Sequence, residues 1–186
     1  MLAAGASSRF GSPKQLVEVE GEPLVRKSAK AALAAGATHV FVVLGASARR
    51  IAPALENVAG VSAIENANWQ SGLSSSLAVG LRAVIDLTTA DGALVTLADQ
   101  ALIDGSALAL LVAGFDATHR VVASSYDGVI GVPALFGREF LEELTTFHGD
   151  AGAGAWLRAH AAIVTKVPLA IASLDIDTPH DASRVR

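Results

Sequence analysis

Short apolar runs suited to buried strands alternate along the whole chain with segments of helical periodicity. The run at 38–44 is rich in valine and is typical of a buried strand, whereas Leu77, Leu81 and Ile85 fall on one face of a helix. This succession favours a mostly parallel (mixed) sheet with helices on both faces. The sequence therefore predicts a three-layer α/β fold. Its 186 residues fit a single domain over 1–186, since no repeat or linker divides them.

The same periodicity assigns the individual elements. Strands are expected at 1–3, 38–44, 61–65, 92–97, 120–124 and 164–167. Helices are expected at 23–35, 47–55, 74–85, 104–113 and 138–144, and after the loop at 148–154 up to residue 160. The strand at 1–3 is only a strand end, so either it is unusually short or a few native residues are lacking before it.

Charge and composition exclude several functions. The formal net charge of −4 disfavours a general nucleic-acid binder, which needs a basic face. The chain has no cysteine and so neither a disulfide framework nor a thiolate metal site. No apolar run approaches the roughly 20 residues of a membrane span. The absence of a recognisable signal peptide favours the cytoplasm.

A glycine-rich loop with two permanent cations follows the first strand. Small residues from Ala3 to Ser8 let backbone N–H groups approach a polyphosphate closely, and Arg9 and Lys14 add positive charge. The spacing is neither that of a P-loop nor the Rossmann Gly-x-Gly-x-x-Gly. Because the loop comes directly after a strand, we predict that it binds a triphosphate. A glycine-rich turn with solvated charges is the alternative.

Two acidic segments are candidates for a metal site. Asp99 follows the apolar strand at 92–97, at the sheet edge where open α/β sheets bind ligands. Asp175 and Asp177 alternate near the C-terminus and so lie on one strand face. Mg²⁺ prefers one or two carboxylates plus substrate phosphates, which these acids can supply. The alternatives are a helix cap for Asp99 and a solvated acidic edge at 175–177.

A polar segment at 66–77 leads into the helix at 74–85. Its serines, Ser74 to Ser76, offer hydroxyls and free N–H groups that suit the base and ribose of a nucleotide. By itself such a run is more often an ordinary helix cap. The loop at 148–154 also carries an acid, but the histidines of the chain show no metal-ligand spacing.

These segments occur in the order of a known family. The loop Leu-Ala-Ala-Gly-x-Ser-x-Arg-x-Gly-x-Pro-Lys at 2–14 resembles the signature of nucleoside-diphosphate-sugar pyrophosphorylase-like transferases. Together with 66–77, Leu-Ala-Asp-Gln at 97–100, Gly-Asp-x-Gly-Ala at 149–153 and Asp-Ile-Asp-Thr-Pro at 175–179, it is similar to the molybdenum-cofactor nucleotidylyltransferases, and above all to their cytidylyltransferase-like subgroup. The resemblance implies an NTP-transferase domain with a Rossmann-like fold of the nucleotide-diphospho-sugar transferase type.

The resemblance also implies roles for particular residues. Those that bind the nucleotide are Leu2, Ala3, Ala4, Gly5, Gly72 and Ser76. Those that act on the triphosphate during catalysis are Arg9, Lys14 and Asp99, and those that hold Mg²⁺ are Asp99 and Asp177. In this family a phosphate monoester attacks the α-phosphorus of the NTP and pyrophosphate leaves, without a covalent enzyme intermediate.

The expected base and acceptor follow from the same resemblance. Guanylyltransferase relatives carry a second glycine where this chain has Ala4, whose methyl group would crowd a purine, so CTP is expected over GTP. The acceptor is expected to be a phosphorylated small molecule, molybdopterin by resemblance. Val132, Ala101 and Gly154 replace the family's usual histidine, proline and arginine. The missing arginine removes an anion contact for that acceptor.

Two other functions stay open. A non-catalytic nucleotide- or cofactor-binding accessory protein for a molybdenum hydroxylase would keep this fold and have a molybdoenzyme as its partner. The joint presence of Arg9, Lys14 and Asp99 favours an active transferase instead. A nicotinamide-dependent dehydrogenase is disfavoured, because the sequence has no Gly-x-Gly-x-x-Gly.

Overall fold

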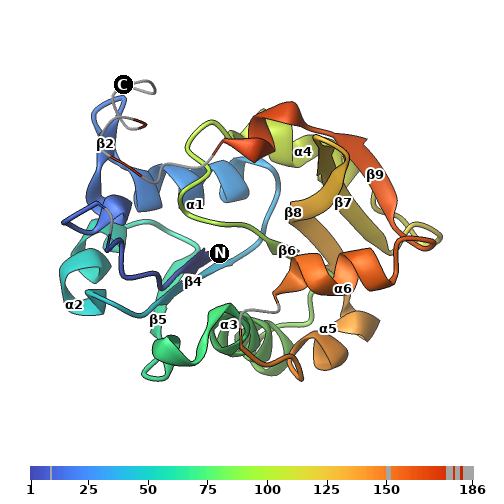
Figure 1. Cartoon of the computed structure of the whole chain (residues 1–186), viewed down its shortest axis with the longest axis horizontal. Coiled ribbons are helices and arrows are strands. Elements are labelled where there is room, and N and C mark those ends of the chain that lie inside the picture. Colours follow the sequence, from blue (N-terminus) through green and yellow to red (C-terminus); the bar gives the residue numbers. More distant parts are fainter. Residues whose placement is uncertain (9, 150–151, 175–177, 179–180, 182–186) are drawn as a thin grey trace.

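Helices lie on both sides of a layer of strands (Figure 1). The computed structural model describes the whole chain except residues 9, 150–151, 175–177, 179–180 and 182–186. The helices are α1 (Leu24–Ala34), α2 (Ala48–Ile51), α3 (Leu73–Leu87), α4 (Gly105–Ala113), α5 (Arg138–Leu144) and α6 (Ala153–Ala159). In Figure 1, α1 and α4 lie above the strands and α3, α5 and α6 below them. None of the described helices is long and apolar enough to cross a membrane.

The strands form two groups that the first strand links. They are β1 (Leu2–Ala3), β4 (Val40–Leu44), β5 (Val61–Glu65), β6 (Gly92–Val95), β7 (Val121–Tyr126), β8 (Val129–Gly137) and β9 (Thr165–Pro168). One group is parallel in the order β1-β4-β5; the other has the order β6-β8-β7-β9, with β8 antiparallel to β6 and β7. Leu2 donates its N–H to Thr96 O at 2.8 Å and accepts from Ala98 N at 3.0 Å, so β1 also contacts the segment after β6. The expected mixed, largely parallel sheet is therefore confirmed.

Shorter elements connect the main ones. A small antiparallel hairpin is formed by β2 (Glu18–Val19) and β3 (Glu22–Pro23). The 3₁₀ turns are η1 (Lys14–Leu16), η2 (Ala52–Leu55), η3 (Trp69–Ser71) and η4 (Ala170–Ser173). Of these turns, η1 follows the glycine-rich loop and η3 precedes α3.

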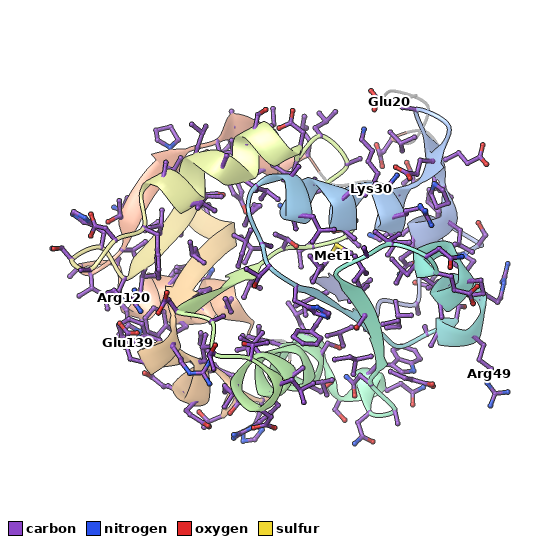
Figure 2. The ribbon with its side chains drawn as sticks, turned by 180° about the vertical axis from the view of Figure 1, so that it is seen from behind. Met1, Glu20, Lys30, Arg49, Arg120 and Glu139 are labelled. Carbon is purple, nitrogen blue, oxygen red and sulfur yellow. The ribbon has the colours of Figure 1, made fainter. Side chains whose placement is uncertain are left out.

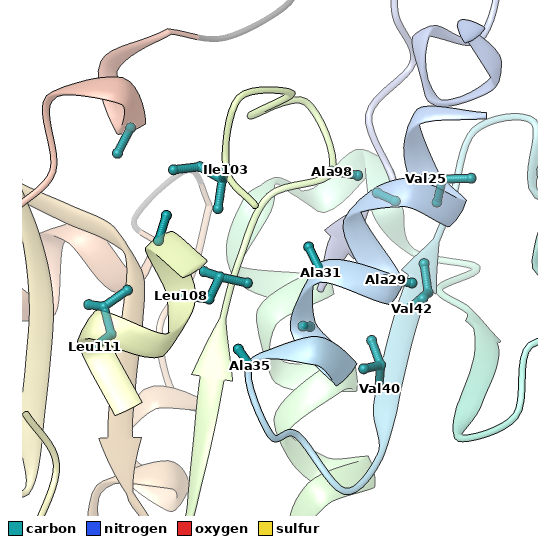
Figure 3. Packing of buried hydrophobic residues seen from close by; sticks show 14 of the residues in the cluster. Val25, Ala29, Ala31, Ala35, Val40, Val42, Ala98, Ile103, Leu108 and Leu111 are labelled. Carbon is teal, nitrogen blue, oxygen red and sulfur yellow. The ribbon is translucent and has the colours of Figure 1, made fainter. Parts of the chain in front are cut away.

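Successive residues of the buried strands face opposite helix layers. In β4, Val42 and Leu44 belong to the apolar cluster that includes α1, whereas Val43 belongs to the cluster that includes α3. Figure 3 shows Val25 and Ala29 of α1 beside Val42. The small side chains of α1 let the helix approach the sheet closely, and burial on both faces explains why this strand is a continuous apolar run.

Aromatic and polar contacts hold α5 and α6 to each other and to the sheet. Trp156 is fully buried, packs edge-on against Phe136 of β8 and donates its Nε1–H to Glu143 at 2.9 Å. Arg120 donates its Nε–H to Glu139 of α5 at 2.9 Å, and both lie at one edge of the molecule in Figure 2. This hydrogen bond lowers the pKa of the Glu139 carboxyl.

Most expected elements have the predicted type, and β5 and α5 have the predicted bounds. The strand β8 was not predicted, because its glycines and Pro133 look like strand breakers. Its register against β7 shifts between Ala123 and Ser124, so that Val132 and Pro133 fall between paired residues. A proline is tolerated there because no ladder bond needs its missing N–H. The helix expected at 47–55 is α2 followed by the 3₁₀ turn η2.

Candidate functional site

A cleft of about 460 Å³ lies where β1 and β6 end. Three segments form it: the loop after β1, the polar stretch from η3 into α3, and the residues after β6. The lining residues are Leu2, Ala3, Ala4, Gly5, Ser7, Ser8, Lys14, Gln15, Trp69, Gln70, Gly72, Leu73, Ser76, Leu97, Ala98 and Asp99. The carboxyl ends of parallel strands are where open α/β sheets bind their ligands.

The structure brings most of the predicted site residues together in this cleft. Those that line it are Leu2, Ala3, Ala4, Gly5, Lys14, Gly72, Ser76 and Asp99. Arg9, Asp175 and Asp177 lie outside the described residues. The roles assigned to all of these residues stay predictions.

Lys14 and Asp99 form an ion pair at the wall of the cleft. Lys14 Nζ donates to Asp99 Oδ2 at 2.6 Å, and the two side chains are 15% and 23% exposed. The other carboxylate oxygen, Oδ1, is buried and has no hydrogen-bond partner among the described residues. A buried carboxylate oxygen without a partner is costly, and a ligand that donates to it or a cation that binds it removes that cost.

Asp99 does not cap the helix that follows it. The N-cap of α4 is Asp104, whose carboxylate accepts from Ala107 N at 2.8 Å. The alternative role for Asp99 as a helix cap is therefore wrong, and its carboxylate remains directed to Lys14 and the cleft.

A buried glutamine that the sequence did not single out holds the glycine-rich loop. Gln15 donates from Nε2 to Ala3 O at 2.9 Å and to Gly5 O at 3.1 Å. Its Oε1 accepts from Ser7 Oγ at 3.2 Å, and Ser7 Oγ accepts from Lys14 N at 3.1 Å. The position of Gln15 directly after Lys14 is the one sequence signal that could have pointed to it. Nothing in the sequence indicates that Gln15 is buried.

The opposite wall of the cleft is built on the start of α3. Asn66 donates from Nδ2 to Ser75 Oγ at 2.9 Å and to Ser76 Oγ at 3.0 Å, which fixes both hydroxyls. Ser74 Oγ donates to Gly149 O at 2.7 Å and ties this wall to the loop before α6. The N-cap residue is Gly72, and no serine side chain caps the helix, so the ordinary-cap interpretation of the serine run is wrong.

An apolar part of the wall depends on a glycine that the sequence analysis also missed. Trp69 and Leu73 line the cleft, and Leu73 is 41% exposed. A Cβ at Gly45 would lie 2.5 Å from Trp69 Cβ and 2.8 Å from Ala4 O. Only glycine therefore lets η3 and the glycine-rich loop approach the end of β4 this closely.

The cleft combines the groups that a nucleotide requires. A lysine cation, a carboxylate and a glycine-rich loop lie on one side, and a partly apolar wall with fixed hydroxyls lies on the other. At the carboxyl edge of a layered α/β sheet, this set is typical of a nucleotide-binding protein.

The comparison with protein families agrees with that class. Residues 1–164 match the MobA-like NTP transferase domain, and the chain belongs to this family. It is a nucleotidyltransferase enzyme by that membership, as the sequence predicts.

Two curated relatives match over the whole chain. Nicotine blue oxidoreductase of Paenarthrobacter nicotinovorans is 29% identical over 196 residues, covering 100% of this chain and 94% of the relative. The purine catabolism protein PucB of Bacillus subtilis strain 168 is 29% identical over 198 residues, covering 100% of this chain and 93% of the relative.

Solved structures share the fold over nearly the full length. Rv0371c of Mycobacterium tuberculosis is 28% identical, with a TM-score of 0.78 over 98% of this chain and 94% of that one. Its manganese complex is 27% identical and gives a TM-score of 0.72 over 99% and 94%. A nucleotidyl transferase from Methanothermobacter thermautotroptrophicus is 24% identical, with a TM-score of 0.82 over 100% and 93%, and this likeness shows the fold alone.

Two more distant structures share the fold and differ in their nucleotides. CMP:2-keto-3-deoxy-manno-octonic acid synthetase complexed with CTP is 17% identical, with a TM-score of 0.71 over 99% of this chain and 94% of that one. Molybdopterin-guanine dinucleotide biosynthesis protein A of Archaeoglobus fulgidus is also 17% identical, with a TM-score of 0.62 over 99% and 94%. The fold by itself therefore does not choose between cytosine and guanine.

Proposed function

We propose that the protein transfers CMP from CTP to a phosphorylated small-molecule acceptor, molybdopterin in the first instance, with Mg²⁺ and release of pyrophosphate. The observation that carries the proposal is the placement of Lys14, Asp99 and the glycine-rich loop around one cleft. The proposed reaction would take place in the cytoplasm. The expected partner is a molybdenum hydroxylase that receives the product.

The chemical step forms one bond and breaks another. An oxygen of the acceptor phosphate attacks the α-phosphorus of CTP, and the bond from that phosphorus to the oxygen bridging to the β-phosphorus breaks. The electron pair leaves with pyrophosphate. Lys14 and the loop N–H groups would bind the phosphate oxygens, and Arg9 would add a second cation. Positioning and charge neutralisation supply most of the rate in such a reaction.

The residues present fit a divalent metal ion. Asp99 offers a carboxylate at the cleft, with a buried Oδ1 that has no partner in the described part of the chain. Mg²⁺ binds through one or two carboxylates together with substrate phosphates, and Asp177 is the proposed second ligand. The ion would neutralise charge on the triphosphate. The manganese complex of Rv0371c supports a divalent metal in this fold.

The preference for CTP rests on Ala4. Its side chain is buried and lines the cleft, and its carbonyl accepts from Ala46 N at 3.1 Å, which fixes the position of its Cβ. A methyl group held at this place would narrow the space for a purine and leave room for a pyrimidine. Selection by shape alone is modest, about tenfold to a few hundredfold per methyl-sized difference.

A second candidate is an oxidoreductase. It is favoured by the full-length similarity to nicotine blue oxidoreductase, at 29% identity. The sequence lacks the Gly-x-Gly-x-x-Gly loop that a Rossmann dinucleotide site uses, which favours nucleotidyl transfer. The third candidate, an accessory protein without catalysis, is disfavoured because the chain belongs to a nucleotidyltransferase family.

One experiment separates the three candidates. Pyrophosphate release is measured with each of the four NTPs, with Mg²⁺ or Mn²⁺, against a panel of phosphorylated acceptors that includes molybdopterin. The expected result is release with CTP and one acceptor. Oxidation of NADH and NADPH is measured in parallel, with pigments as electron acceptors. Activity in this assay alone would support the oxidoreductase. Nucleotide binding without either activity would support the accessory protein.

A further inference from the structure

The geometry points to Gln15 as a positioning residue that holds the loop 4–8 in its triphosphate-binding conformation. This inference rests on the proposed function. Gln15 is 3% exposed, and its amide makes three hydrogen bonds: it donates to Ala3 O at the end of β1 and to Gly5 O in the loop, and it accepts from Ser7 Oγ. Because the donors and the acceptor of this buried amide bind residues of the loop and its start, Gln15 can affect ligand binding through the conformation of the loop.

The anchored carbonyls determine where the loop N–H groups point. In a trans peptide the C=O and the following N–H point in opposite directions. Because Gln15 binds Ala3 O and Gly5 O, the N–H groups of Ala4 and Ala6 point away from the buried amide. Ala46 N binds Ala4 O in the same way, so the N–H of Gly5 points away from Ala46.

The N–H groups of the loop remain available for a ligand. Within the described residues, those of Gly5, Ala6, Ser7 and Ser8 donate no hydrogen bond. Gly5, Ala6 and Ser8 are exposed, so a ligand can reach this part of the loop. Several adjacent free N–H groups form a concave anion site of the kind that binds phosphates.

Backbone strain in the loop requires such support. Ser7 has φ of 52°, a left-handed conformation that costs a non-glycine residue free energy. Its hydroxyl is fixed from two sides, by Gln15 Oε1 and by Lys14 N. Gln15 is therefore linked through Ser7 to the backbone of Lys14, and losing Gln15 would release the N–H groups of the loop from their fixed directions.

The test compares Gln15→Met with Arg138→Met. Met keeps the volume of Gln15 and removes its hydrogen bonds. Arg138 is a matched control because it also donates to two carbonyls, Ile85 O at 2.8 Å and Ala90 O at 3.2 Å, and does not line the cleft. Calorimetric titration measures the affinity for Mg²⁺-CTP and for inorganic tripolyphosphate with Mg²⁺, and a thermal melt measures stability.

The expected result is a selective loss of phosphate affinity. If the loop in Gln15→Met keeps its binding conformation about one tenth of the time, both ligands bind about tenfold more weakly. The KM for CTP rises to a similar extent, whereas kcat at saturating CTP stays within about threefold, because the bound loop regains its geometry. Arg138→Met should lower the melting temperature and leave both affinities unchanged.

Other outcomes either overturn the inference or support it while contradicting the proposed function. Unchanged affinity for both ligands in Gln15→Met would overturn it, as would an equal loss in Arg138→Met or no tripolyphosphate binding by the wild-type protein. If the wild type binds tripolyphosphate and Gln15→Met weakens this, but no CTP turnover is found, the positioning role stands and the proposed function fails. Should Gln15→Met not fold, Ser7→Ala tests the same link at a partly exposed site and should weaken tripolyphosphate binding about threefold.

Discussion

Lys14 Nζ lies 2.6 Å from Asp99 Oδ2, although 85 positions separate the two residues in the chain. They meet because β1 and the segment after β6 are parallel neighbours, linked by the bridge between Leu2 and Leu97. Both segments therefore leave the sheet at the same edge. The ion pair places one positive and one negative charge at the cleft before any ligand arrives. A triphosphate with its metal ion has the complementary charges.

Lys14→Ala is expected to weaken CTP binding at least tenfold, since a hydrogen bond to a charged group contributes about 1.5–3 kcal/mol. Calorimetric titration with Mg²⁺-CTP measures the change. Lys30→Ala is the control: Lys30 on α1 (labelled in Figure 2) is half exposed and does not line the cleft, and its loss changes net charge equally. An equal loss in both variants would show that only net charge matters.

Asp99→Asn is expected to slow turnover by several powers of ten, each equivalent to about 1.4 kcal/mol of barrier, because the shape is kept and the metal-binding charge is lost. Turnover is measured against Mg²⁺ concentration. Asp104→Ala is the matched control, since it removes the cap of α4. It should cost about 1 kcal/mol, or about 2–4 °C in melting temperature, at normal turnover. Near-normal turnover in Asp99→Asn would contradict the metal role.

Sequence patterns were sufficient to predict an element where the local pattern of residues agreed with the environment of that element in the folded protein. The short strand at 61–65 and the helix at 138–144 have their predicted bounds, and the convergence of Lys14 with Asp99 follows from parallel strand order. The burial of Gln15 could not be predicted, because it depends on contacts with Ala3 and Gly5 that only the folded loop provides.

Two further misses have different physical origins. The need for glycine at position 45 arises from the approach of Trp69 and Ala4, which come from different parts of the chain. Asp99 was given a possible capping role because it precedes α4, whereas Asp104 lies one residue before the helix and fills that role. Tertiary contacts therefore decide the case of Gly45, whereas the cap is decided by a local bond from Ala107 N to Asp104.

Ala4→Gly is expected to raise the affinity for GTP relative to CTP about tenfold, because the methyl group proposed to exclude the purine is gone. Competition binding with the four NTPs measures the ratio. Ala6→Gly makes the same chemical change in the same loop at an exposed residue that does not line the cleft, so it controls for added flexibility. Tighter GTP than CTP binding by the wild-type protein would refute the steric explanation.

Asp116 is expected to make stability depend on pH in the acid range. Its carboxylate accepts from His119 N and Thr118 N at 2.7 Å each, and chiefly the bond from His119 N lowers its pKa to about 2. Because the folded pKa lies below the unfolded value of about 3.9, the stabilisation is full above that value and is lost as the pH falls toward 2. Between about pH 4 and about pH 2, the free energy of unfolding measured with urea should fall more steeply for the wild type than for Asp116→Asn. Parallel curves would contradict this assignment.

Gly45→Ala is expected to damage the cleft from beneath. The added Cβ would lie 2.5 Å from Trp69 Cβ and 2.8 Å from Ala4 O, closer than real Cβ contacts, so the loop or η3 must move. Overpacking of this kind typically costs about 1–3 kcal/mol. Because Ala4 belongs to the glycine-rich loop, we expect weaker CTP binding, about tenfold, in addition to a lower melting temperature.

The control for this substitution is Gly154→Ala. Gly154 is the second residue of α6. Apart from its chain neighbours and the backbone of that helix, the only described heavy atom within 4 Å of an added Cβ is Arg158 Nη1 at 3.3 Å, the movable end of a long side chain. Alanine favours a helix over glycine by about 1 kcal/mol, so this variant should be at least as stable as wild type. Calorimetric titration with CTP and a thermal melt are measured for both variants. If Gly45→Ala binds CTP as the wild type does, the close approach at Gly45 serves packing alone and does not shape the nucleotide site.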